Sequence, residues 1–100
     1  MLPKIEFEWD EPVALTLRFA QGLEVPSKYY ERWPGDTIQY RFTAEEGIFW
    51  LPDTAGALLN ARLEARGVLA GETVFITKVR AENPNSSRSV IEYVPERCEA

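Results

Sequence analysis

The densest group of chemically reactive side chains in this sequence is acidic. Glu6, Glu8, Asp10 and Glu11 fall within six residues near the start of the chain. Neighbouring carboxylates can form an acid/base pair or bind a hard cation such as Ca²⁺. Residues 5–9, however, alternate apolar and acidic side chains, which is typical of a strand with one face in solvent. The pattern therefore predicts solvated acids rather than a catalytic or metal-binding group.

The residue types that are absent exclude most other chemistry. The sequence contains no histidine and one cysteine, so it has neither the histidine base of a hydrolytic triad nor the ligands of a zinc site. It also contains no glycine-rich phosphate-binding motif of the P-loop or dinucleotide type. We therefore expect a protein that is not an enzyme, with no catalytic residues, no metal ligands and no cofactor.

Length and composition favour one small domain. The chain has 100 residues, 45% hydrophobic and 27% charged, which is ordinary globular composition. We expect a single domain over 1–100, with an acidic strand extension at 1–12 and a short tail at 96–100. No apolar run is long enough to span a membrane. A single cysteine cannot form an internal disulfide, so we expect a reducing, cytoplasmic location and no membrane partner.

Most of the chain has the pattern of short strands. Odd positions are apolar from 13 to 19, and runs rich in β-branched and aromatic residues follow later, separated by segments rich in Pro, Gly, Asn and Ser. There is no internal repeat. Strands are expected at 13–19, 37–43, 47–52, 71–81 and 88–94, with loops at 26–36 and 83–87.

One segment has the period of a helix instead. A helix over 54–66 places Leu58, Leu59 and Leu63 on one face, and Gly67 follows as a typical C-terminal residue. We expect this leucine face to pack against the strands.

Two neighbouring strands carry large side chains on both faces. Successive side chains of a strand point to opposite sides, so only one set from each strand can fill the core. The other set needs a different explanation. In the strand at 37–43 the expected core face holds Ile38, Tyr40 and Phe42, which leaves Thr37, Gln39, Arg41 and Thr43 outside. In the strand at 47–52, Phe49 and Leu51 point one way and Ile48 and Trp50 the other. We expect Trp50 to join Arg41 on the outside.

The order of the elements, with one helix between the third and fourth of five strands, resembles the OB-fold. The resemblance covers roughly residues 12–95 and depends on element order and spacing alone. It implies a mainly β protein, a small five-stranded OB-like barrel with one α-helix between strands 3 and 4. A mixed sheet covered by one helix would give a similar order, so that alternative stays open.

The resemblance also implies a ligand and a place for it. Proteins of this type bind single-stranded nucleic acid on strands two and three and on the flanking loops, where bases stack on aromatic rings and cations pair with phosphates. The residues of suitable type at those places are Arg18, Tyr29, Tyr30, Trp33, Gln39, Arg41, Trp50, Lys78, Arg80 and Arg88.

Each of these residues also has a structural interpretation. A tryptophan on a strand commonly packs in a core, and the aromatic loop 28–33 can fold over the end of a barrel. The arginines and lysines can be solvated strand positions paired with nearby carboxylates.

The overall charge opposes binding to phosphate, because the chain has a net charge of −5. The charge is segregated, however. Residues 1–12 hold four acids and one lysine, whereas residues 13–43 hold four basic and three acidic residues. We therefore expect a non-catalytic module that binds single-stranded DNA, or RNA, as a monomer or homo-oligomer. The alternative is an acidic protein-interaction or inhibitor module that docks on a protein partner through the aromatic loop 28–33.

Overall fold

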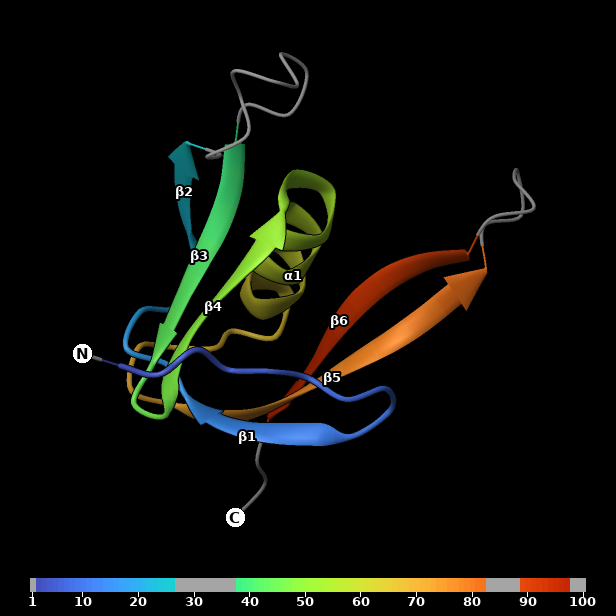
Figure 1. Ribbon diagram of the computed structural model, residues 1–100. Coiled ribbons are helices and arrows are strands. Elements are labelled where there is room, and N and C mark those ends of the chain that lie inside the picture. Colours follow the sequence, from blue (N-terminus) through green and yellow to red (C-terminus); the bar gives the residue numbers. More distant parts are fainter. Residues whose placement is uncertain (1, 27–37, 83–88, 98–100) are drawn as a thin grey trace.

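The computed structural model describes residues 2–26, 38–82 and 89–97. These residues form six strands and one helix, so the fold is mainly β, as the sequence predicts (Figure 1). The helix lies between the fourth and fifth strands in the chain. The elements are β1 (Pro12–Thr16), β2 (Leu23–Pro26), β3 (Ile38–Ala44), β4 (Gly47–Pro52), α1 (Asp53–Ala65), β5 (Thr73–Glu82) and β6 (Ser89–Arg97).

The strands are arranged in two antiparallel sheets. One has the order β1-β5-β6 and the other the order β2-β3-β4. The described residues contain no closed barrel, so the predicted five-stranded barrel is not confirmed. The strand that was not predicted is the short β2. From the sequence, this stretch before Pro26 shows only an extended connection.

A short seam joins the two sheets where β1 ends. Leu17 forms an antiparallel bridge with Ala44 at the end of β3. The Arg18 amide donates to the Thr43 carbonyl at 3.0 Å, and the Glu45 amide donates to the Thr16 carbonyl at 2.8 Å. The chain from β1 to β2 therefore runs along both sheets, pairing first with β5 and then with β3.

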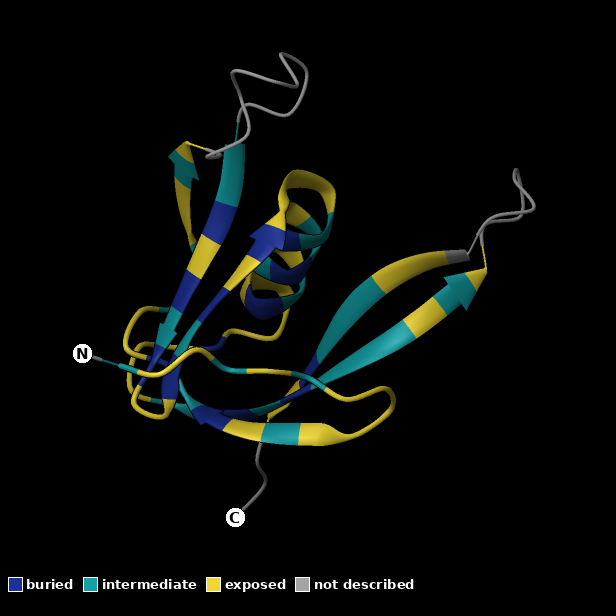
Figure 2. Ribbon diagram, in the orientation of Figure 1, coloured by how far each residue is buried: buried dark blue, intermediate teal, exposed yellow. Residues whose placement is uncertain are grey.

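The hydrophobic core lies between the two sheets and the helix. Figure 2 shows buried residues alternating with exposed ones along β3 and β4 and gathered on the side of α1 that faces these strands. Phe42 and Phe49, opposite each other on β3 and β4, stack with ring centroids 4.9 Å apart. The core face predicted for β3 is confirmed at Tyr40 and Phe42, which are buried, and Ile38 is half-buried. In β4 the buried set is Phe49 and Leu51, and Trp50 is exposed.

Helix α1 closes this core with its leucines. Leu59 and Leu63 are fully buried and Leu58 is half-buried, so the predicted leucine face is largely confirmed. The helix ends at Ala65, and Gly67, two residues later, has a φ of +68°, which suits a residue without a side chain. The Val68 amide then bonds the Leu63 carbonyl at 3.1 Å, which satisfies a carbonyl of the last turn.

The acidic N-terminal segment (residues 3–10) differs from the predicted strand extension. It does not run in line with β1 but crosses from β4 to β5 (Figure 1). At one end the Ile5 amide donates to the Ile48 carbonyl, and the Ile48 amide to the Pro3 carbonyl, both at 2.8 Å. At the other end the Asp10 amide donates to the Lys78 carbonyl at 2.9 Å. The chain then turns into β1 at Asp10, which has a φ of +61°.

Phe7, in the middle of the N-terminal segment, packs between the two sheets. Its ring meets the ring of Phe49 edge-on at 4.9 Å and that of Tyr93 edge-on at 5.2 Å. Phe49 belongs to β4 and Tyr93 to β6. The segment therefore fills the space between two strands that do not pair with each other.

The last strand is longer than predicted. β6 runs to Arg97, two residues into the stretch expected to be a tail, and Pro95 is fully buried. Within the described part of the chain, no helix is long and apolar enough to cross a membrane.

Candidate binding surface

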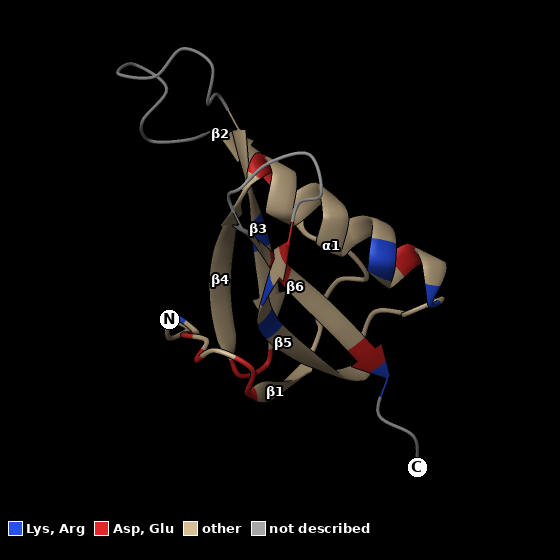
Figure 3. Cartoon of the chain, turned by 90° about the vertical axis from the view of Figure 1, so that its right-hand side faces the viewer, with Lys and Arg blue, Asp and Glu red and all other residues tan. Residues whose placement is uncertain are grey.

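None of the described residues of β2, β3 and β4 that face away from the core is Asp or Glu. We call this side of the β2-β3-β4 sheet the outer face. Strand register places its residues on one surface, because the pairs alternate between core and solvent along the sheet. Figure 3 shows β4 without any charged residue, while acidic residues gather on the N-terminal segment near β1. The outer face consists of Leu23, Val25, Gln39, Arg41, Thr43, Ile48, Trp50 and Pro52.

Arg41 lies at the centre of the outer face, in one row with two large apolar side chains. Leu23 of β2 is paired with Arg41 of β3, and Arg41 is paired with Trp50 of β4. Leu23 is 56% exposed and Trp50 42% exposed. Strands lie about 4.8 Å apart, so the row spans about 10 Å. None of the described carboxylates forms an ion pair with Arg41.

A shallow hollow of about 210 Å³ adjoins this row on the β2 side. Phe19, Leu23 and Arg41 line it together with Gln21, Gly22 and Thr43. Phe19 is 64% exposed, so a second aromatic ring is available beside Arg41.

The loop that carries this hollow is fixed to the helix. The Gly22 amide donates to Asn60 Oδ1 at 2.7 Å, and Asn60 Nδ2 donates to the Gly22 carbonyl at 3.1 Å. This pair of hydrogen bonds holds the chain between β1 and β2 against α1, which keeps the hollow in place.

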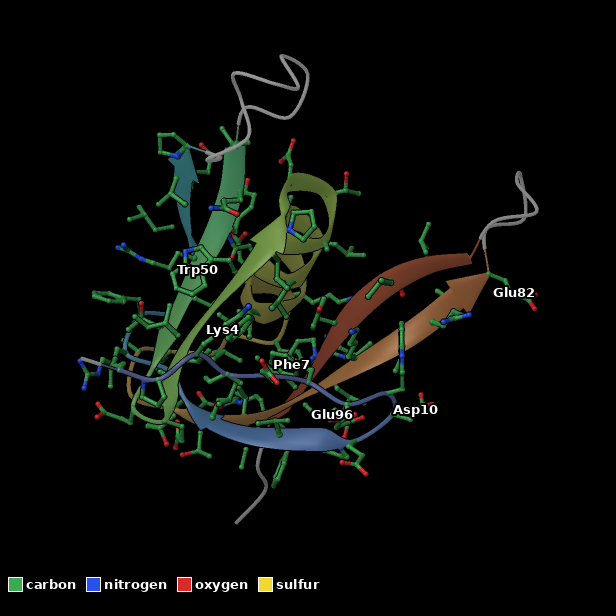
Figure 4. All side chains as sticks on the ribbon, viewed as in Figure 1. Lys4, Phe7, Asp10, Trp50, Glu82 and Glu96 are labelled. Atoms are coloured by element: carbon green, nitrogen blue, oxygen red, sulfur yellow. The ribbon has the colours of Figure 1, made fainter. Side chains whose placement is uncertain are left out.

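A second hollow, of about 290 Å³, adjoins the row on the β4 side. It is lined by Lys4, Glu6, Trp50, Lys78 and Tyr93, with Ile5, Phe7, Phe49 and Leu51. In Figure 4, Trp50 projects from β4 above Lys4, and Phe7 lies below, toward β5 and β6. Burial raises the pKa of the Tyr93 hydroxyl, so it stays protonated and can donate a hydrogen bond at neutral pH.

Glu24, the sequence neighbour of Leu23, is held on the other side of the sheet. Glu24 lies between Leu23 and Val25 in β2, so its side chain points to the opposite face. There the Tyr40 hydroxyl donates to Glu24 Oε1 at 2.9 Å. This hydrogen bond raises the pKa of the Tyr40 hydroxyl, and burial adds to the effect. The negative charge of Glu24 therefore lies away from Arg41.

Lys78 and Arg80, two of the predicted binding residues, lie apart from the outer face and are covered by an aromatic ring. Lys78 Nζ lies 4.4 Å from the centroid of the Trp9 ring, and the Arg80 guanidinium carbon lies 4.8 Å from it. Both are cation–π contacts. Lys78 also lines the second hollow, which connects it with Trp50.

The remaining predicted residues have mixed outcomes. Gln39 lies on the outer face, half-buried and two residues before Arg41. Arg18 lies at the seam between the sheets, where it pairs with Glu45 at 3.3 Å. Tyr29, Tyr30, Trp33 and Arg88, together with the aromatic loop 28–33, lie outside the described residues.

The predicted binding residues did not include Phe19, Leu23, Lys4 or Trp9. Phe19 continues the apolar odd positions of β1 and therefore resembles a core residue, but the chain bends after Leu17 and exposes it. Leu23 has no sequence signal beyond its place in a short extended stretch. Lys4 and Trp9 belong to the segment predicted as a strand extension, and only the tertiary structure brings them to Trp50 and Lys78.

In the described residues, no three Asp, Glu or Cys side chains come together as ligands for a metal ion. Searches with protein-family models, curated proteins and solved structures gave no match.

Proposed function

We propose that this protein is a non-catalytic module that binds single-stranded nucleic acid, DNA or RNA, across the outer face of β2-β3-β4. The observation that carries the proposal is the position of Arg41 directly opposite Trp50 on the outer face, where none of the described residues of β2, β3 and β4 is acidic. In a chain with 16 acidic residues and a net charge of −5, such a face is suited to an anion, and Glu6 lines the hollow at its β4 edge.

The outer face offers both interactions that a single strand needs. Bases stack on flat rings, and Trp50 and Phe19 are exposed on either side of Arg41. A guanidinium between two stacking rings can pair with the phosphate that joins two stacked nucleotides. The two hollows lie at the two ends of the row, so a strand can cross β2, β3 and β4 in turn.

The proposal retains the OB-type arrangement suggested by the sequence. It is supported by the helix between β4 and β5 and by the chain from β1 to β2, which runs along both sheets. The single cysteine suits a reducing compartment such as the cytoplasm.

The experiment is a fluorescence titration of the full chain with short oligothymidylate and oligouridylate. Binding should quench tryptophan emission, and Trp50→Ala should weaken binding by about 1–3 kcal/mol, the scale of one base–aromatic stack. Arg41→Ala should weaken binding and reduce its salt dependence, which is shallow in the wild type because few cations are available. Leu69→Ala is the matched control, since Leu69 is 68% exposed and lies outside the outer face.

A titration without quenching at micromolar protein and low salt contradicts the proposal. Equal affinities for the wild type and Trp50→Ala would place any binding elsewhere on the molecule.

The hollow beside Phe19 and Leu23 favours the second candidate, docking of a protein partner. Exposed Phe and Leu side chains beside an arginine also occur at protein interfaces. In this case Leu23→Ala and Phe19→Ala should reduce capture of a protein partner, and oligonucleotides should leave the tryptophan fluorescence unchanged.

A further inference from the structure

Trp9 of the N-terminal segment packs on two cations of β5, and one of them, Lys78, lines the hollow beside Trp50. The Trp9 ring lies over both Lys78 and Arg80, at 4.4 and 4.8 Å. Trp9 is paired with Lys78, and the next amide, that of Asp10, donates to the Lys78 carbonyl. A flat ring on two cations, held by one strand-like hydrogen bond, resembles the contacts that a nucleotide base makes with lysine and arginine.

The same segment also carries three acidic residues. Glu6, Glu8 and Asp10 alternate with apolar residues, against the single cation of Lys4. Glu6 and Glu8 are exposed. The segment thus combines aromatic rings with regularly spaced anions, the two features of a single strand.

The position of the segment continues the row on the outer face. The hollow of about 290 Å³ is lined by Trp50 on one side and by Lys4, Glu6 and Lys78 on the others. In Figure 4 the segment runs below Trp50, from Lys4 past Phe7 to Asp10 beside β5. A ligand that leaves Trp50 on the β4 side therefore reaches this segment before it reaches Lys78 and Arg80.

We propose that the N-terminal segment competes, within the same chain, with the single-stranded ligand for Lys78 and Arg80. Trp9 lies where a base would stack on both cations, and Glu6 lines the same hollow as Lys78. A strand that extends from Trp50 toward β5 must displace Trp9, and it then gains both cations. This inference rests on the proposed function.

The contacts of the N-terminal segment differ between its middle and its end. Phe7 packs against Phe49 and Tyr93 and anchors the middle of the segment between the sheets. Trp9, in contrast, is 40% exposed and makes cation–π contacts of the weak, solvated kind. The end near Asp10 can therefore detach while Phe7 stays in place.

The test compares the affinities of full-length variants for a 15-mer of thymidylate. Trp9→Ala should tighten binding by about fivefold or more, the scale of releasing one or two exposed cation–π contacts. Glu6→Gln with Glu8→Gln should also tighten binding, without removing any ring. Arg80→Ala in the Trp9→Ala background should cancel the gain. Trp50→Ala should have the opposite effect and weaken binding.

Hydrogen exchange gives a second measurement on the wild-type chain. Saturating oligonucleotide should speed exchange of the Asp10 amide, which loses its Lys78 partner, while the Ile5 amide, bonded to Ile48, stays protected. Thermal unfolding of each variant confirms that it is folded.

The two proposals fail in different ways. If the oligonucleotide binds and Trp50→Ala weakens binding, but Trp9→Ala binds no more tightly, the competition is refuted and the proposed function stands. Weaker binding by Trp9→Ala also refutes it, because Trp9 is then a ligand contact. If neither the wild type nor Trp9→Ala binds, both proposals are wrong.

Discussion

Gly56 of α1 lies so close to β3 that one added methyl group should destabilise the protein. An ideal Cβ at Gly56 would lie 2.6 Å from the Cβ of Tyr40 and within contact of its ring. The Cβ of Tyr40 is fixed by the backbone and cannot rotate away. Gly56→Ala therefore requires the helix and β3 to move apart.

The expected size of the effect follows from two opposing terms. Overpacking in a core costs about 1–3 kcal/mol. Alanine, on the other hand, is favoured over glycine inside a helix by about 1 kcal/mol. Because the clash involves a side-chain atom next to the backbone rather than a flexible end, we expect the upper part of the first range. The net loss in the free energy of unfolding should be about 1–2 kcal/mol.

Urea denaturation measures this loss, and Ala57→Gly is the matched control. Ala57 is the next residue of the same helix and is exposed, so its substitution reports the propensity term alone, a loss of about 1 kcal/mol. If Gly56→Ala instead stabilises the protein by about the amount that Ala57→Gly destabilises it, the close packing of α1 on Tyr40 is refuted.

Three further predictions concern a core leucine, one ion pair and one hydrogen bond. Leu59→Ala should cost about 2–5 kcal/mol in urea denaturation because Leu59 is fully buried; a loss below about 0.5 kcal/mol would contradict the packing of α1. The hydrogen bond from Arg97 lowers the pKa of Glu72 below its usual 4.5, so this pair should stabilise the fold at neutral pH and lose its contribution as the pH falls below about 4.5. Thermal midpoints of the wild type and Glu72→Gln should converge at low pH, and a constant difference down to pH 3 would contradict this. Glu24→Ala should lower the pKa of Tyr40 toward 10.0, measured by NMR titration, and an unchanged pKa would show that burial alone raises it.

The sequence by itself determined the elements whose pattern is local. Helix α1 spans Asp53–Ala65 against a predicted 54–66, because the spacing of its leucines depends only on the helical period. The two faces of β3 and β4 were predictable for the same reason, since side chains alternate along any strand. In β3 hydrophobicity also indicated the buried side, because Gln39 and Arg41 occupy the other one. In β4 both sides are apolar, so the exposure of Trp50 was a hypothesis that the tertiary structure had to decide.

Only the tertiary structure decided which strands pair and where the chain ends cross. Arg41 and Trp50 belong to one candidate site because β3 and β4 pair in a register that sets them opposite each other, and many other registers have the same alternation. The division into two sheets depends on the bend after Leu17, where Phe19 leaves the core although its spacing matches that of Leu15 and Leu17.

The N-terminal segment shows most clearly what the sequence determines and what only the tertiary structure decides. Its alternation of acidic and apolar residues predicted an extended chain, and the alternation is the same whether that chain lies beside β1 or crosses from β4 to β5. The contacts that decide between the two join residues far apart in sequence, Ile5 with Ile48 and Trp9 with Lys78. Local periodicity records which side of a strand is buried, but the partner that buries it depends on packing of the whole chain.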